Sequence, residues 1–571
     1  MRRFLFIVSY IIIAHTSSGQ SAYIGAGKSI DPFTTQIVKA HTFNNGAVSS
    51  AHPLASEVGA FILVRGGNAF DAAAATQFAL AVVFPQAGNL GGGGFITARK
   101  HNGELITIDY REAAPAKAHR DMYLDKEGNP VDGLSLSGHL ASGVPGAVAG
   151  ILETARYGRL SLKEIIDPAI SLAETGFVIT KEEADNLNHW KEKFLQYNTR
   201  NTAFVKNEEW KPGDTLIQIE LAETLKRIRE NGAKGFYEGK TARLIAEEMQ
   251  RGKGIISLED LKNYTAKHRD PVIFNYRGYE VISFPPPSSG GLLLGQMLKM
   301  AEPFPLKNKG HNSVKTVHLM AEIERRAYAD RAEYMGDPDF YQVPVTQLLQ
   351  DAYLKNRMQS FHPDKASKST DTKAGTITES TQTTHFSVAD KEGNMVSVTT
   401  TLNTGYGSKV VIGGAGFLMN NEMDDFSIKP GVPNIYGATG GDANAIAPGK
   451  RMLSSMTPTL IVKDNKPFLI VGTPGGTTIP TSVFQSIVNI IDFGMSPQKA
   501  IDAPKFHHQW LPDRIDVERN FPDNVLQELK AIGHTVNKRG TIGRVEIIQF
   551  DEKGRLLAAA DSRGDDSVAG F

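Results

Sequence analysis

The stretch that decides the fold is residues 383–402, TTHFSVADKEGNMVSVTTTL. Polar and apolar residues alternate over 383–389, residues 390–394 (DKEGN) have the composition of a turn, and 395–402 forms a second strand pattern. This arrangement predicts a β-hairpin whose first strand begins at Thr383. Threonine favours strands in general, so the pair Thr383-Thr384 taken alone also fits a purely structural role.

The residues just before this hairpin have a different character. Residues 363–382, PDKASKSTDTKAGTITESTQ, are rich in Lys, Ser, Thr and Asp and lack periodic apolar positions, which predicts an exposed, mobile segment. Such a segment ahead of a threonine suits an N-terminal nucleophile. A threonine hydroxyl needs a base, and a freed α-amino group on the same residue, with a pKa of about 8, supplies one once the preceding bond is cut.

Patterns in the rest of the chain predict a mixture of helices and strands with no internal repeat and no linker between independent domains. The alanine-rich, apolar stretch 68–84 predicts a buried helix. Further helices are expected within 151–183, 221–252, 292–302 and 314–334, and strands within 105–111, 272–283, 459–462 and 468–471. The last of these strands runs into Gly472-Thr473-Pro474-Gly475-Gly476.

Composition excludes several classes of function. Lys+Arg and Asp+Glu are both 62 in 571 residues, so the chain has no net charge that would attract nucleic acid or anionic lipid. The absence of cysteine excludes a thiol enzyme and a Cys-ligated zinc site. No G-x-S-x-G or H-E-x-x-H motif is present, and His507-His508 is better explained as two packed histidines than as a metal site.

The N-terminus predicts export. Arg2 and Arg3 precede an apolar run over 4–14, and small and polar residues follow over 16–22. This is the pattern of a secretory signal peptide, which we place at residues 1–22, and the run is too short to span a bilayer. A buried N-terminal helix or strand is the alternative. The mature protein is expected to be periplasmic or secreted, without a membrane anchor.

Many motifs, in order from about residue 35 to the C-terminus, resemble the γ-glutamyltransferase family of N-terminal-nucleophile hydrolases. They are GGNAF (66–70), PQAGNLGGGGF (85–95), DYREAAP (109–115), TTHFSVAD (383–390), TTTLN (399–403), NNEMDDFS (420–427), KPGVPNIY (429–436), GGDANA (440–445), LSSMTP (453–458), TPGG (473–476) and APKFHHQWLP (503–512). The resemblance implies an α+β fold, a four-layer αββα sandwich. It also implies self-cleavage between Gln382 and Thr383 into a large subunit, 23–382, and a small catalytic subunit, 383–571, which form a heterodimer.

The same resemblance assigns roles at the site. Thr383 is the implied nucleophile, Thr401 orients it, and the backbone N–H groups of Gly475 and Gly476 stabilise the oxyanion. The other implied roles are substrate binding by Arg111 (α-carboxylate), by Ser454 and Ser455 (assisting Arg111) and by Asn403, Glu422 and Asp425 (α-ammonium), with Tyr436 in a lid loop. On local grounds alone, Arg111 also fits a surface ion pair with Glu112, Asp424-Asp425 a solvated turn, and Gly475-Gly476 a simple tight turn.

The implied substrates are glutathione and other γ-glutamyl compounds, with water, an amino acid or a dipeptide as acceptor. No cofactor, metal or nucleic acid is implied. Two alternatives stay open: a related enzyme that removes glutaryl groups from cephalosporins, and an unprocessed, non-catalytic member of the family. A glutaryl group lacks the α-ammonium, so Asp425 favours γ-glutamyl specificity.

Overall fold

The computed structural model describes residues 30–34, 36–372, 383–429 and 441–571. Within these ranges the predicted hairpin is confirmed: β10 (Thr383–Asp390) pairs antiparallel with β11 (Met395–Thr401). The hairpin lies in the middle of a sheet, because β2 pairs with the outer side of β10 and β3 with the outer side of β11. Strands from both halves of the sequence therefore share one hydrogen-bonded ladder.

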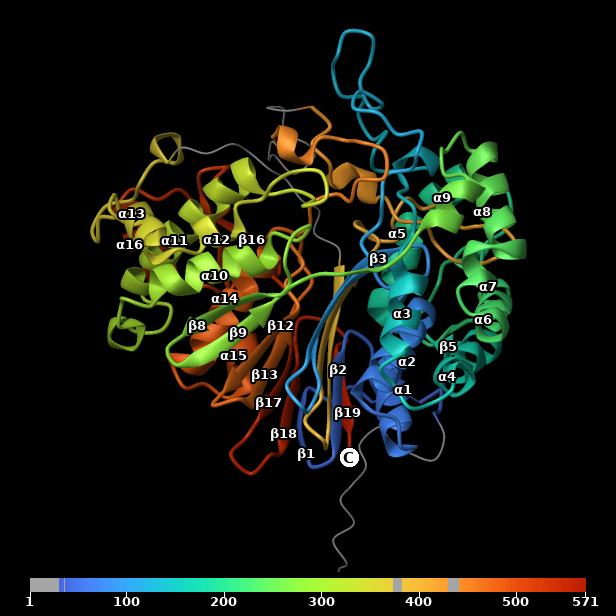
Figure 1. Cartoon of the computed structure of the whole chain (residues 1–571), viewed down its shortest axis with the longest axis horizontal. Helices are drawn as coiled ribbons and strands as arrows, with labels where there is room; N and C mark the ends of the chain where they lie inside the picture. Colours follow the sequence, from blue (N-terminus) through green and yellow to red (C-terminus); the bar gives the residue numbers. More distant parts are fainter. Residues whose placement is uncertain (1–29, 35, 373–382, 430–440) are drawn as a thin grey trace, which may run out of the picture.

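Two antiparallel sheets, each of seven strands in the described ranges, form the centre of the molecule (Figure 1). The sheet that holds the hairpin, sheet B, has the order β19 (Ser567–Gly570), β2 (Gly46–Ser50), β10, β11, β3 (Gly93–Arg99), β4 (Leu105–Asp109), β7 (Lys267–His268). The other, sheet A, has the order β1 (Ala40–Phe43), β18 (Leu556–Ala560), β17 (Glu546–Phe550), β13 (Lys466–Gly472), β12 (Thr459–Lys463), β9 (Tyr279–Ser283), β8 (Val272–Tyr276). The sheets pack face to face, with β10 and β11 against β13 and β17.

Helices cover the outer face of each sheet (Figure 1). On the side of sheet B lie α1 (Pro53–Val64), α2 (Ala69–Val83), α3 (Ala147–Ala155), α4 (Leu162–Thr175), α5 (Lys181–Tyr197), α6 (Ile219–Asn231), α7 (Lys234–Tyr237), α8 (Gly239–Arg251) and α9 (Leu258–Asn263). On the side of sheet A lie α10 (Gly290–Ala301), α11 (Val314–Tyr334), α12 (Val345–Leu348), α13 (Asp351–Arg357), α14 (Thr478–Ile491), α15 (Pro497–Asp502) and α16 (Asp523–Ala531). The α+β, four-layer αββα expectation is confirmed.

Smaller elements complete the description. Strands β5 (Phe177–Val178) and β6 (Thr215–Leu216) form a two-stranded sheet. A three-stranded sheet contains β14 (Phe506–His507), β15 (Ile515–Glu518) and β16 (Val536–Arg539). The stretch 151–183 is helical but interrupted: α4 ends at Thr175, the next residue is Gly176, whose φ of +76° suits glycine, and β5 follows. None of the helices in the described ranges has the length and apolar character needed to cross a membrane.

The buried helix expected over 68–84 is α2, and every one of its residues is buried. Its alanines allow close packing against β10 and β11. Asn68 caps it by accepting hydrogen bonds from the N–H groups of Phe70 and Asp71, and Asp71 Oδ2 accepts from Asn68 N at 2.9 Å. Asp71 also accepts from Arg159 N and Leu160 N, so one buried carboxylate joins the start of α2 to the loop before α4.

We predict that Asp71→Ala lowers the free energy of unfolding by about 2–4 kcal/mol, because several buried N–H groups lose their acceptor. The shift in the midpoint of thermal or urea unfolding measures it. Asp185→Ala is the control, since the pair that Asp185 forms with Lys181 is exposed and is expected to contribute little to stability. Equal midpoints for the two variants would contradict the role given to Asp71.

Candidate active site

Thr383 is the first residue of β10 and lies directly opposite Thr401 on β11. It is 9% exposed, so its surroundings are protein on most sides. Thr401 Oγ1 accepts a hydrogen bond from Asn403 N at 2.7 Å, and the Asn403 side chain donates to Asn421 O at 3.0 Å. The structure thus brings Thr383, Thr401 and Asn403 together at one end of the hairpin.

The alternation of side chains along β10 sets the direction in which Thr383 points. Thr383, His385 and Ser387 share a face, and this face is turned toward sheet A. His385 packs so closely on Gly472, at the end of β13, that a Cβ there would lie 2.2 Å from its ring. Burial lowers the pKa of His385 to about 3, so its imidazole is neutral and occupied with the hydroxyls of Thr399 and Ser387.

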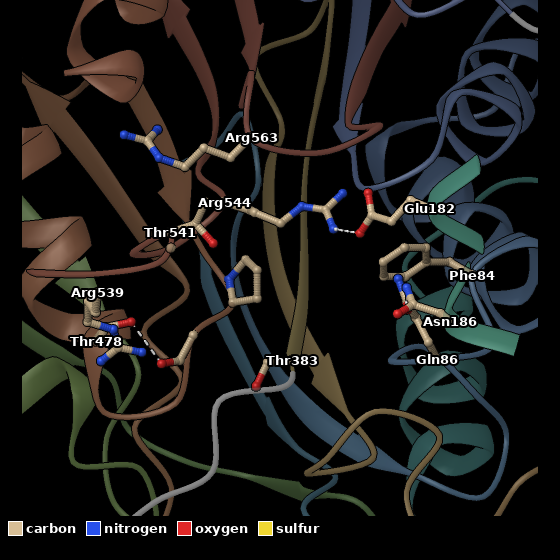
Figure 2. A pocket seen from close by; sticks show the side chains of 13 residues that line it. Phe84, Gln86, Glu182, Asn186, Thr383, Thr478, Arg539, Thr541, Arg544 and Arg563 are labelled. Atoms are coloured by element: carbon tan, nitrogen blue, oxygen red, sulfur yellow. Dashed lines mark hydrogen bonds and ion pairs between the residues drawn. The ribbon is translucent and has the colours of Figure 1, made fainter. Parts of the chain in front are cut away.

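The chain that leaves β13 passes Thr383 before it enters α14. Gly475 and Thr383 line the same cavity (Figure 2). Gly475 and Gly476 have φ values of +136° and +59°, a region that favours glycine. Neither amide N–H donates a hydrogen bond to any described residue. Gly475, which lines the cavity with Thr383, thus presents a backbone N–H without an acceptor among the described residues, three residues before the start of α14.

Arg111, just after β4, is buried and not a surface residue, so its interpretation as a surface ion pair is wrong. Its Nη1 lies 2.6 Å from Glu422 Oε2 and 3.7 Å from Glu112 Oε2, and its Nη2 pairs with Asp425. Its Nε donates to Met452 O at 3.2 Å. One guanidinium thus serves three carboxyl groups in the interior of the protein.

The pKa values of the three carboxyl groups around Arg111 are shifted from their ordinary values. Burial raises the pKa of Glu422 and Asp425, and raises that of Glu112 to about 8, while Arg111 opposes each rise. Glu422 Oε2 lies 2.6 Å from Arg111 Nη1, whereas Glu422 Oε1 and Asp425 Oδ1 accept no side-chain or backbone hydrogen bond from the part of the chain that the structure describes. Because buried charges need partners, this cluster can accept a second cation with several N–H donors.

Asp424 and Asp425 belong to the 3-10 helix η4 (Glu422–Asp425) and are 2% and 6% exposed, so the solvated-turn alternative is wrong. The two neighbours point to different partners. Asp424 Oδ1 accepts from Ser135 Oγ at 2.5 Å, whereas Asp425 pairs with Arg111. Burial raises the pKa of Asp424 to about 7.

Ser454 and Ser455 follow Met452 and Leu453, whose carbonyl oxygens accept from Arg111. Ser454 Oγ accepts from Met456 N at 3.1 Å, and Ser455 Oγ accepts from Arg331 Nη2 at 3.0 Å. The strand-like segment that carries them therefore runs alongside Arg111. Gln382 and Tyr436 lie outside the described residues.

Sequence reasoning missed Arg331 and considered Glu112 only as a surface partner of Arg111. Glu112 belongs to the Arg111 cluster, and Arg331 on α11 contacts Ser455 and acts electrostatically on Asp425. Glu112 follows Arg111 directly, but adjacency gives no sign that both are buried. Arg331 lies in a helix dense in charged residues, and no local pattern indicates which of them face inward.

The two histidines of 507–508 are packed side chains, as expected. His507 contacts Thr481 Oγ1 and Gln509 Oε1, both at 2.9 Å, and His508 Nδ1 accepts from Trp510 N. A different group, His318, Glu322 and His534, has ligand atoms close enough for a metal ion. Its members already satisfy one another and their neighbours: the histidines are hydrogen-bonded at 2.7 Å, and Glu322 pairs with Arg326 at 2.6 Å.

Comparison with known proteins agrees with this geometry. The chain is 48% identical over 532 residues to a glutathione hydrolase proenzyme of Escherichia coli (strain K12), covering 92% of each protein. Among solved structures, the cephalosporin acylase from Bacillus halodurans matches with a TM-score of 0.81 and 28% identity, over 95% of this chain and 99% of that one. The gamma-glutamyltranspeptidase of Helicobacter pylori matches with a TM-score of 0.56 and 46% identity, over 60% of this chain and 97% of that one.

The sequence model described as Gamma-glutamyltranspeptidase matches residues 55–571, which is most of the chain and includes every site residue discussed above. The resemblance seen in the sequence motifs is confirmed. The chain belongs to the gamma-glutamyltranspeptidase family.

Proposed function

We propose that this protein is a self-processing γ-glutamyltransferase and glutathione hydrolase whose nucleophile is Thr383. The observation that carries the proposal is one juxtaposition. Thr383 begins a central strand, Gly475 lines the same cavity with an N–H that has no acceptor among the described residues, and a buried arginine with an excess of carboxyl groups follows β4 of the same sheet. The name and high identity of the E. coli relative support the same activity.

The chain would first cut itself. The Thr383 hydroxyl attacks the carbonyl carbon of Gln382, the C–N bond breaks, and the acyl group moves to oxygen as an ester. Water then hydrolyses the ester, which leaves a carboxylate on Gln382 and a free amine on Thr383. The products are the large subunit, 23–382, and the small subunit, 383–571, which remain associated through sheet B.

The free amine would then act as the base in turnover. Thr401, directly opposite on β11, would orient it, and its pKa of about 8 suits proton transfer near neutral pH. The Thr383 oxygen attacks the γ-carbonyl of the substrate, while the N–H groups of Gly475 and Gly476 stabilise the oxyanion. Water or an amine then takes the γ-glutamyl group from the threonine ester.

The Arg111 cluster would hold the amino-acid end of the substrate. The α-carboxylate binds Arg111 with help from Ser454 and Ser455, and the α-ammonium binds Asp425, Glu422 and Asn403. Binding exchanges the internal pair between Arg111 and its carboxyls for two pairs with the substrate. A zwitterionic ligand suits this exchange because it brings one charge of each sign.

Three further parts of the proposal concern residues outside the described ranges. Residues 1–22 act as a signal peptide, so the enzyme is exported to the periplasm or the medium. Tyr436, in the loop before η5 (Asp442–Asn444), closes over the bound substrate. Gln382 supplies the carbonyl that is attacked in processing.

A glutaryl or cephalosporin acylase is the second candidate, favoured by the structural match to the Bacillus halodurans enzyme. A glutaryl group carries no ammonium, so it would leave Asp425, Glu422 and Glu112 without the cation that their surplus calls for. The buried acids therefore favour a γ-glutamyl substrate. An unprocessed, non-catalytic member would have no use for the donors at Gly475 and Gly476.

We predict two bands for the wild-type protein on a denaturing gel and one band for Thr383→Ala. The variant should lose at least about a thousandfold in release of p-nitroaniline from γ-glutamyl-p-nitroanilide, since its nucleophile is gone. Thr383→Ser, which keeps a hydroxyl, should still be cut. A single wild-type band without release would refute the proposal in favour of a non-catalytic protein.

We also predict that Asp425→Asn lowers kcat/KM for γ-glutamyl-p-nitroanilide by roughly 30-fold, or about 2 kcal/mol, because a carboxylate that faces the ammonium is lost. Asp424→Asn is the matched control: the same change one residue away, at a side chain bound to Ser135, should have little effect. Gels establish that both variants are cut. Faster release from glutaryl-p-nitroanilide than from the γ-glutamyl compound by the wild type would favour the acylase.

A further inference from the structure

A lysine that the proposed mechanism does not use is buried in the loop that also carries Asn403. Lys409 lies in the segment that follows β11, and it is 2% exposed. None of the carboxylates in the described residues pairs with its ammonium. Burial, with a smaller contribution from Lys193, lowers the pKa of Lys409 to about 7. Because a lysine is rarely buried without a partner of opposite charge, the position of this one calls for an explanation.

The Lys409 ammonium contacts three groups. Its Nζ donates hydrogen bonds to Gly407 O at 2.7 Å and to Thr404 Oγ1 at 3.0 Å. It also lies 4.2 Å from the centroid of the Trp190 ring on α5. An aromatic face stabilises a cation most strongly where water is excluded. The side chain therefore closes the loop on itself between residues 404 and 409 and joins it to α5.

The backbone of this loop adopts conformations that need support from their surroundings. Asn403, Tyr406 and Lys409 have φ values of +76°, +59° and +65°, in the left-handed region that few residues other than glycine adopt. Such conformations persist only where neighbouring groups impose them, and they gather at functional sites. The Asn198 side chain, just after α5, donates to Lys409 O and accepts from Val411 N, both at 2.8 Å. The end of α5 thus holds the loop from the outside.

Thr404 connects Lys409 to the residues proposed to bind the α-ammonium. Its hydroxyl accepts hydrogen bonds from Lys409 Nζ and, at 2.9 Å, from Asn421 Nδ2, and its N–H donates to Asn421 Oδ1 at 3.1 Å. Asn421 O accepts in turn from Asn403 Nδ2 at 3.0 Å. Asn421 is also the residue before η4, which begins with Glu422. One asparagine therefore sets how Asn403 lies relative to Glu422, and Lys409 holds the threonine that orients that asparagine.

We propose that Lys409 is a positioning residue for substrate recognition, holding the loop of Asn403 and the start of η4 in the arrangement that binds the α-ammonium. It acts through Thr404 and Asn421 and touches no substrate itself. The inference rests on the proposed function, which supplies the ammonium.

Loss of the Lys409 side chain should weaken binding of the ammonium and leave the reaction at Thr383 largely intact. Within the described ranges, neither Lys409 nor Thr404 is hydrogen-bonded to Thr383 or to Gly475. A lysine that only stabilised the fold would instead affect ligands with and without an ammonium alike.

The test compares two competitive ligands that differ in the α-ammonium alone, glutamate and glutarate, each as an inhibitor of γ-glutamyl-p-nitroanilide hydrolysis. The wild type should bind glutamate more tightly. Lys409→Met, which keeps a long apolar side chain but no N–H donor, should lower this preference about tenfold, because the hydrogen bonds that hold Thr404 are lost. Its kcat should stay within about threefold of the wild-type value.

Variants of Thr404 test the connection without removing the lysine. Thr404→Val has nearly the same shape but no hydroxyl, and it should also lower the preference for glutamate. Thr404→Ser keeps the hydroxyl and should retain most of that preference. This pair decides the question if Lys409→Met does not fold.

Lys206→Met is the matched control. Lys206 likewise lies over a tryptophan ring, 4.8 Å from the centroid of Trp210, but it pairs with Asp214 and not with the loop after β11. Its loss should leave the preference for glutamate at the wild-type value.

Equal weakening of glutamate and glutarate binding by Lys409→Met and Thr404→Val would overturn the inference, as would no change with either variant. In both cases γ-glutamyl-p-nitroanilide is still hydrolysed, so the proposed function stands. A wild type that binds glutarate as tightly as glutamate, or that releases no p-nitroaniline, would overturn the proposed function itself.

Discussion

Strand β10 has to keep Thr383 in place whether or not a peptide bond precedes it. Strand β11 pairs with it from Thr383 onward, and β2 pairs with its other edge from Phe386 to Asp390, so these two ladders together hold the strand. The direction of the nucleophile, the contact of His385 with Gly472 and the course of the loop past Thr383 all follow from this register. Packing of α2 against the outer face of the same strands then fixes the sheet from behind.

A second constraint is electrostatic. The site gathers three carboxyl groups and one guanidinium where water is excluded, and the raised pKa values of those acids report the cost of that arrangement. Such a cluster is poorly suited to stabilising the fold by itself. It is well suited to a ligand that carries both an ammonium and a carboxylate. The excess of carboxyl groups over guanidinium groups therefore favours a substrate that brings its own positive charge.

Sequence reasoning predicted what depends on local pattern. The hairpin from Thr383, the buried helix α2 and the motif residues around Arg111 all emerged from alternation, apolar content or family resemblance. The burial of Arg111 and its pairing with Glu422 and Asp425 did not, because they result from the packing of η4 and the segment around Met452 on the end of β4. Arg331 carried no local signal, since only the packing of α11 decides which of its many charged residues reaches Ser455.

The interleaving of β2, β10, β11 and β3 also decides what kind of complex a cut chain would be. The boundary between the two pieces would run through the inside of a sheet, so separating them would amount to unfolding them, and dilution alone would not do it. Refolding would be another matter. The precursor folds as one molecule, whereas two denatured pieces must first meet in solution, and their recovery would depend on protein concentration. The precursor could thus unfold and refold as one chain, whereas the cut protein, once denatured, would have to reassemble from two separate chains.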